Sequence, residues 1–164
     1  MDTSGATFTD AEQRQVTAAL LTLRIIAGAL IMGVATFAAV TIFLVNDNPN
    51  DDWSLLFWLA LGGTVLAIIM SQVMTAMVSR GAVTRDITVE KALAIYSQRV
   101  IVGMAILEGA AFFTLVIFLI EGQWLLLAAT ALLVVLMFIK FPSRGGLVRW
   151  IEERRQLAEL AGNE

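Results

Sequence analysis

The stretch VIVGMAILEGAAFFTLVIFLI, residues 100–120, carries one charged side chain, Glu108, within an otherwise uncharged and mostly apolar run. A helix rises 1.5 Å per residue, so a run of this length crosses the ~30 Å hydrocarbon core of a bilayer. Hydrophobic residues make up 59% of the chain, above the roughly 45–50% of soluble domains, and the mean hydropathy is +0.82. The stretch therefore predicts a transmembrane helix, and the composition predicts an integral membrane protein in contact with the lipid bilayer.

Three further apolar segments, 16–45, 53–78 and 124–139, are also predicted to span the membrane. The last of them is the shortest and needs a thin membrane or little tilt to cross it. No basic region precedes the first, so we expect it to remain as a helix rather than to be cleaved as a signal peptide. The predicted fold is all-α: a single integral membrane domain over 1–164, built as a four-helix transmembrane bundle with a C-terminal amphipathic helix.

The basic residues predict the orientation of these spans. All eleven Lys and Arg fall before or at the start of the first span, between the second and third, or after the fourth, whereas the loops 46–52 and 121–123 carry only acids. The positive-inside rule then places both termini in the cytoplasm, and we expect the protein in a bacterial inner (plasma) membrane. Because topology alone accounts for the basic residues, they do not indicate nucleic-acid binding.

The chain contains no cysteine and no histidine. Disulfides, zinc sites with nitrogen and sulfur ligands, haem held by histidine and Ser-His nucleophile pairs are therefore excluded. We predict that the protein is not an enzyme and that it uses no cofactor and no metal.

Local signals predict where the helices begin and end. Thr9 and Glu12 form a capping-box pattern, so the first helix is expected over 9–45, which makes it about 55 Å long. Asp86 or Thr88 is expected to cap the third helix. Pro142 and the pair Gly145-Gly146 are expected to break the chain after the fourth span, and 147–161 reads as an amphipathic helix on the inner surface or docked on the overhanging helices.

A shift of 75 residues lays 24–45 over 99–120 and gives nine identities in 22 positions. The second and fourth spans also align, through Trp53 with Trp124 among others. We interpret the chain as two hairpin repeats, 9–80 and 86–141, followed by the tail helix 147–161. At the position of Glu108 the first repeat has Gly33, so only one repeat carries the acid. The nine identities pair Arg24, Ile26, Gly28, Ile31, Ala35, Phe37, Ile42, Phe43 and Leu44 with Arg99, Ile101, Gly103, Ile106, Ala110, Phe112, Ile117, Phe118 and Leu119.

The neighbours of Glu108 follow from counting depth along each span. Glu108 lies eight residues from the start of its span, about 12 Å deep. The same count on the other helices arrives at Ser71 and Gln72 and near Thr130, which become the candidate ligands, while Gly33 leaves room for the carboxylate. Arg24 and Arg99 are expected to extend toward the headgroups rather than to pair with Glu108.

Two interpretations of Glu108 follow. In one, a neutral carboxylic acid donates a hydrogen bond to Ser71 or Gln72 and holds helices together, because hydrocarbon disfavours the charged form. In the other, Glu108 with Ser71, Gln72 and Thr130 binds or moves a proton or cation. A contact to lipid, quinone or a partner is a further alternative.

Small residues recur every four positions on the second span, at Gly63, Ala67, Ser71 and Thr75. This spacing favours close helix packing. Together with the absence of catalytic groups, it favours a non-enzymatic structural or accessory membrane protein that packs as a homo-oligomer or in a larger membrane complex. Proton or cation translocation through Glu108 is the alternative function.

The stretch 100–120 is similar to the ion-binding helix of subunit c, the rotor-ring proteolipid of F-type and V-type ATPases. There a carboxylate follows small and apolar residues and precedes an aromatic residue, and a basic loop, here 79–86, comes before the helix. The resemblance implies that Glu108 binds a proton or sodium ion and that many copies form a membrane ring. That family places its acid on the second helix of a hairpin, whereas the repeat here places it on the first. Over its whole length the chain resembles a small bacterial family of four-span membrane proteins.

Overall fold

A computed structural model describes residues 9–45, 54–80 and 89–161, and every regular element in this part of the chain is an α-helix. The expected all-α class is therefore confirmed. In chain order, the helices are α1 (Asp10–Leu44), α2 (Leu55–Arg80), α3 (Val89–Glu121), α4 (Trp124–Ile139) and α5 (Arg144–Ala161).

The start of α1 is the predicted capping box. The Glu12 amide donates to the Thr9 hydroxyl over 3.4 Å, and the Thr9 amide donates back to the Glu12 carboxylate over 2.8 Å. These two bonds satisfy donors that the first turn of a helix otherwise leaves without acceptors. The predicted caps of α3, Asp86 and Thr88, lie outside the described residues.

The tail helix begins earlier than the sequence predicts. The expected break at Gly145-Gly146 is wrong, because both glycines belong to the first turn of α5, which starts at Arg144. Ser143 initiates this turn: its hydroxyl accepts from the Gly146 amide over 3.1 Å, and its carbonyl accepts from the Leu147 amide over 3.1 Å. A serine N-cap stabilises a helix start enough to accommodate two glycines.

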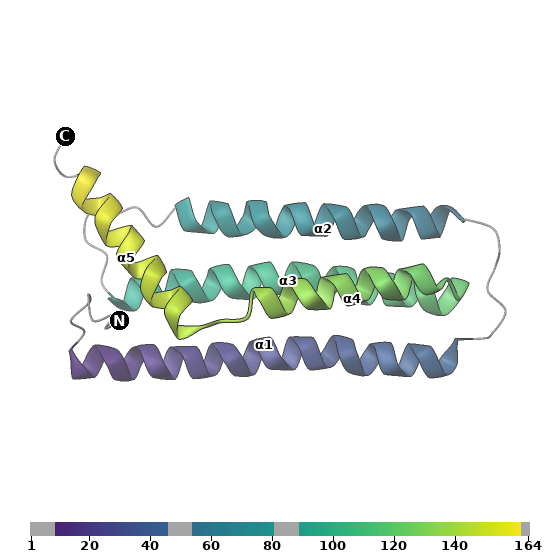
Figure 1. Ribbon diagram of the computed structural model, residues 1–164, viewed down its shortest axis with the longest axis horizontal. Helices are drawn as coiled ribbons and strands as arrows, with labels where there is room; N and C mark the ends of the chain where they lie inside the picture. The colour runs from purple at the N-terminus through teal and green to yellow at the C-terminus, as the bar shows by residue number, and fades with distance from the viewer. Residues whose placement is uncertain (1–8, 46–53, 81–88, 162–164) are drawn as a thin grey trace.

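Helix α3 is the centre of the packing and contacts α1, α2 and α4. Figure 1 shows α3 and α4 between α1 on one side and α2 on the other. The helices consecutive in the chain, α1 and α2, thus pack against α3 rather than against each other. Parallel α1 and α3 bring together residues 75 apart, since the rings of Phe37 and Phe112 meet edge to face with centroids 5.4 Å apart.

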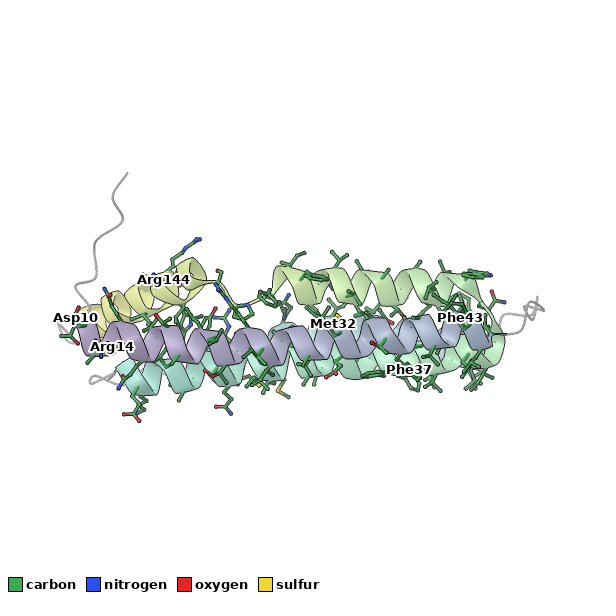
Figure 2. The ribbon with its side chains drawn as sticks, turned by 90° about the horizontal axis from the view of Figure 1, so that it is seen from below. Asp10, Arg14, Met32, Phe37, Phe43 and Arg144 are labelled. Atoms are coloured by element: carbon green, nitrogen blue, oxygen red, sulfur yellow. The ribbon has the colours of Figure 1, made fainter. Side chains whose placement is uncertain are left out.

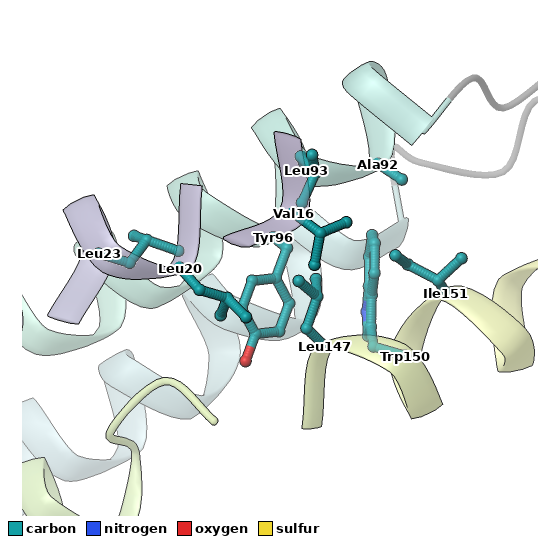
Figure 3. Close-up of a cluster of buried hydrophobic side chains, with 9 residues drawn as sticks. All are labelled: Val16, Leu20, Leu23, Ala92, Leu93, Tyr96, Leu147, Trp150 and Ile151. Atoms are coloured by element: carbon teal, nitrogen blue, oxygen red, sulfur yellow. The ribbon is translucent and has the colours of Figure 1, made fainter. Parts of the chain in front are cut away.

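The tail helix α5 docks on the first turns of α1 and α3. Trp150 of α5 lies against Tyr96 of α3, with ring centroids 5.9 Å apart, and Val16 of α1 closes the cluster (Figure 3). Of the two expected locations for this helix, the docked one is found. We call this end of the molecule the basic end, because Arg24, Arg99, Lys140 and Arg149 belong to it. The complete cluster consists of Val16, Leu20, Leu23, Ala92, Leu93, Tyr96, Leu147, Trp150 and Ile151.

Two more buried clusters follow α3 away from the basic end. The middle one is centred on Val34, Leu107 and Leu133, and the far one on Phe57 and Phe118. The outward faces are apolar as well: Met32 is 64% exposed and Phe43 is 88% exposed. Figure 2 shows Asp10, Arg14 and Arg144 toward one end, with Met32, Phe37 and Phe43 along the remainder.

Three helices, α1, α2 and α3, are long and apolar enough to cross a membrane. Helix α4 has 16 residues, about 24 Å, and meets the same criteria only together with the start of α5 across a 61° bend. The shortness of the predicted fourth span is therefore a real property of the helix.

Candidate functional site

Glu108 lies near the middle of α3 and is half-buried where α3 meets α1. A Cβ atom added at Gly33 would lie 3.7 Å from the Glu108 Oε1 and 3.7 Å from the Phe112 ring. The structure thus places Gly33 beside the carboxylate, as the repeat predicts, and a Cβ there would be in ordinary van der Waals contact with both side chains. No hydrogen bond reaches the carboxylate from the residues that the structure describes.

The three predicted ligands of Glu108 have other surroundings. The Ser71 hydroxyl donates to the Gly103 carbonyl over 2.9 Å, and the Thr130 hydroxyl donates to the Leu126 carbonyl of its own helix over 3.0 Å. Gln72 is exposed and lines a cavity at the basic end. The described contacts therefore do not join Ser71, Gln72 or Thr130 to Glu108.

The predicted equal depth of Ser71 and Glu108 is wrong, and the two also differ in rotation about α3. Ser71 faces Gly103, which precedes Glu108 by five residues on α3, about 7.5 Å along the axis and 140° around it. Counting residues from the ends of the apolar runs therefore misjudged the relative depth of α2 and α3, and it does not say which neighbour a side chain faces.

The small-residue face of α2 packs closely on α3. Ala67, Ser71 and Thr75 are buried, and a Cβ added at Gly103 of α3 would come within 2.8 Å of the Thr75 methyl group. The Thr75 hydroxyl donates to the Ser71 carbonyl over 2.8 Å, so its polar atom is satisfied within α2. This face is an interhelical contact surface of the kind that small residues form in membranes.

Lys140 makes a polar contact that the sequence did not predict, since it served there only as evidence for the orientation of the spans. Its ammonium donates to the Ser71 hydroxyl over 2.7 Å, which connects the end of α4 to α2 and, through Ser71, to the Gly103 carbonyl. Burial lowers the pKa of Lys140 below its ordinary value, and the positive charge of Arg99 lowers it further. Ser71 and Lys140 each lie 16 residues after the first residues of their helices, Leu55 and Trp124, but the start at Leu55 is known only from the structure.

The two arginines of the repeat have different surroundings. The Arg24 Nε donates to the Pro142 carbonyl over 3.3 Å and ties α1 to the α4–α5 connection, a contact that the sequence did not predict. Arg99 lines the cavity at the basic end. Neither arginine pairs with Glu108 within the described contacts.

A second acid is buried at the opposite end. Glu121, the last residue of α3, is 5% exposed and accepts a hydrogen bond from the Ser54 hydroxyl, whereas its Oε2 is buried with no hydrogen-bond partner. Ser54 also accepts from the Leu56 amide over 3.0 Å, so it caps α2 while holding α3. Gly122, at a φ of 70°, then reverses the chain toward α4. Sequence reasoning had assigned Glu121 to a loop and missed this link.

The comparisons with known proteins add no assignment: no family model, no curated protein and no solved structure matches the chain. Within 9–45, 54–80 and 89–161, no group of three or more acidic, histidine or cysteine side chains is arranged to hold a metal ion. The relationships to subunit c and to small four-span membrane proteins that the sequence suggested stay predictions.

Proposed function

We propose that this chain is a four-span protein of a bacterial inner membrane, with both termini in the cytoplasm, that acts as a non-enzymatic structural or accessory subunit. The three long apolar helices, the exposed apolar side chains along them and the gathering of basic residues at one end support this placement. Under this proposal, α4 spans a locally thinned membrane, since it provides only about 24 Å.

The observation that carries the accessory role is the environment of Glu108. Its carboxyl group lies in the middle of a membrane-length helix, half-buried, with no donor from the described chain. Leaving a polar group without a partner in hydrocarbon costs several kcal/mol. We infer that the partner comes from another membrane helix and that a second copy of this chain supplies it, because two neutral carboxylic acids can donate to and accept from each other.

Disulfide trapping in native membranes tests this proposal, because the chain contains no cysteine of its own. Ala105 is exposed on α3 about one turn from Glu108, and Ile69 is exposed on α2. We expect Ala105→Cys to give a disulfide-linked dimer and Ile69→Cys to give none. The dimer should persist with Glu108→Gln, whose amide can still pair, and should be lost with Glu108→Ala.

If Ala105→Cys stays monomeric and a photocrosslinker at the same position captures only lipid, the accessory proposal is wrong. Capture of a different membrane protein would mean that the partner of Glu108 belongs to a larger complex and is not a second copy of this chain. Equal dimer yields from Ala105→Cys with and without Glu108→Ala would show that Glu108 does not stabilise the interface.

The alternative function is binding or translocation of a proton or cation through Glu108. It is favoured by the space that Gly33 leaves beside the Oε1 atom. Glu108→Gln separates the two, because an amide keeps hydrogen bonds but does not titrate. Proton flux through liposomes that contain the protein should fall to background in Glu108→Gln under the alternative. Flux equal to that of the wild type would eliminate Glu108 as a carrier.

A further inference from the structure

A cavity of about 490 Å³ opens at the basic end, where the connection between α4 and α5 passes α2 and α3. Three cationic side chains line it, each from a different element: Arg99 of α3, Lys140 at the end of α4 and Arg149 of α5. Its apolar wall includes Leu136 and Trp150. The cavity thus combines a concentrated positive charge with a hydrophobic surface.

The positive charge of this cavity is not neutralised by the described chain. None of Arg99, Lys140 and Arg149 makes an ion pair within the described part. Among the described side chains that line the cavity, Glu153 is the one carboxylate, so three cations and one anion give these side chains a net charge of +2. Arg99 lies near enough to Lys140 to lower the pKa of its ammonium group. Like charges held together without a counterion are a feature that an anionic ligand would stabilise.

Neutral hydrogen-bond donors at the cavity also suit an anionic ligand. Tyr96 and Ser143 line the cavity, and so does Gly146 in the first turn of α5, where an added Cβ would lie 3.0 Å from the Ser143 hydroxyl and 3.6 Å from the Tyr96 hydroxyl. The positive end of the α5 helix dipole lies beside it. Buried Trp150 anchors α5 and so fixes the backbone that carries Arg149.

We propose that this cavity binds a phosphate group through Arg99, Lys140 and Arg149. Two sources share this chemistry: the headgroup of an anionic phospholipid, whose acyl chains would follow the apolar wall, and a soluble phosphate. Basic pockets between membrane helices at the cytoplasmic side are suited to anionic headgroups. The lipid form rests on the membrane placement proposed above, whereas the phosphate chemistry does not.

The test measures lipid binding by native mass spectrometry of the detergent-solubilised protein. We expect phosphatidylglycerol to bind at least about tenfold more tightly than phosphatidylcholine with the same acyl chains. Arg149→Gln should weaken phosphatidylglycerol binding about fivefold, because it removes one basic side chain from the site. Arg144→Gln is the matched control: it removes the same charge from α5, does not line the cavity, and should leave binding unchanged.

Competition by inorganic phosphate identifies the source. If phosphate at millimolar concentration displaces the lipid and raises the melting temperature, the site takes soluble phosphate; if it does neither while lipid binds, the ligand is the lipid headgroup. Equal binding of the two lipids, or equal effects of Arg149→Gln and Arg144→Gln, would overturn the proposal. Because both arms use the solubilised chain, they stay informative even if the assembly through Glu108 fails its own test.

Discussion

Lys140 and Glu108 are ionisable side chains that the helices enclose in different ways. The Lys140 ammonium, at the end of a short helix, donates over 2.7 Å to a buried hydroxyl, whereas Glu108, near the middle of a long helix, lies beside Gly33 and receives no hydrogen bond from the described chain. The lysine side chain is long and flexible, and it reaches inward from the helix end. The shorter glutamate stays on the face of α3 that the helical rotation gives it. Side-chain reach, depth and rotation together decide which of the two finds a partner.

The largest effect is expected from a substitution at Gly103, where α3 packs against α2 near Lys140. In Gly103→Ala the new methyl group would lie 2.8 Å from the Thr75 methyl group, so α2 and α3 must separate or Thr75 must move. We expect a loss of about 2 to 3 kcal/mol in unfolding free energy, in the upper range for overpacking, because Thr75 is stiff at χ1 and its hydroxyl is bonded to α2. Denaturant titration in detergent measures this loss.

Two variants control for this interpretation. Thr75→Ser removes the clashing methyl group and keeps the hydroxyl, so Gly103→Ala combined with Thr75→Ser should recover most of the stability. Gly109→Ala, on the same helix with nothing within 4 Å of the added Cβ, should be neutral or stabilising by up to about 1 kcal/mol. If the Thr75→Ser background leaves the Gly103→Ala loss unchanged, the close contact is not its cause.

A smaller effect is expected at Ser71. Ser71→Ala removes the acceptor of Lys140 and should cost about 1 kcal/mol, because Lys140 is half-buried beside a cavity where water can replace the hydroxyl. In a double-mutant cycle, Lys140→Met should remove part of this cost, because the bond from the Ser71 hydroxyl to the Gly103 carbonyl is lost in either background. Additive losses from Ser71→Ala and Lys140→Met would show that the two side chains are not coupled.

The smallest effect is expected at Glu108 itself. Since Glu108→Gln removes no hydrogen bond of the described chain, the unfolding free energy of the dilute, monomeric protein should change by less than about 0.5 kcal/mol. The same denaturant titration, at a protein concentration too low for association, measures it. A loss comparable to that of Ser71→Ala would mean that Glu108 has a stabilising partner inside the chain.

Much of the helical framework could be predicted from local sequence signals. The capping box at Thr9 and the long apolar runs gave α1 and α3 nearly to their ends, because capping and hydropathy act over a few residues. The start of α5 was missed because the pair Gly145-Gly146 is unfavourable in isolation, and the hydroxyl of Ser143 outweighs it.

The candidate site was less predictable because its contacts are made between helices. The repeat correctly brought Gly33 to Glu108, since parallel helices 75 residues apart keep their register. The partners of Ser71 and Lys140 depend on how α2 and α4 are rotated about α3, and a count of residues along each helix does not contain that rotation.

The most direct test of the account is the dependence of association on dilution in lipid bilayers. The fraction of dimer is measured by single-molecule photobleaching of labelled protein as the ratio of protein to lipid decreases. We predict that the wild type and Glu108→Gln dimerise over a range in which Glu108→Ala, equally folded, is monomeric. A wild type that is monomeric at every dilution, or a Glu108→Ala variant that dimerises as strongly, would contradict the assignment of Glu108 to an interface.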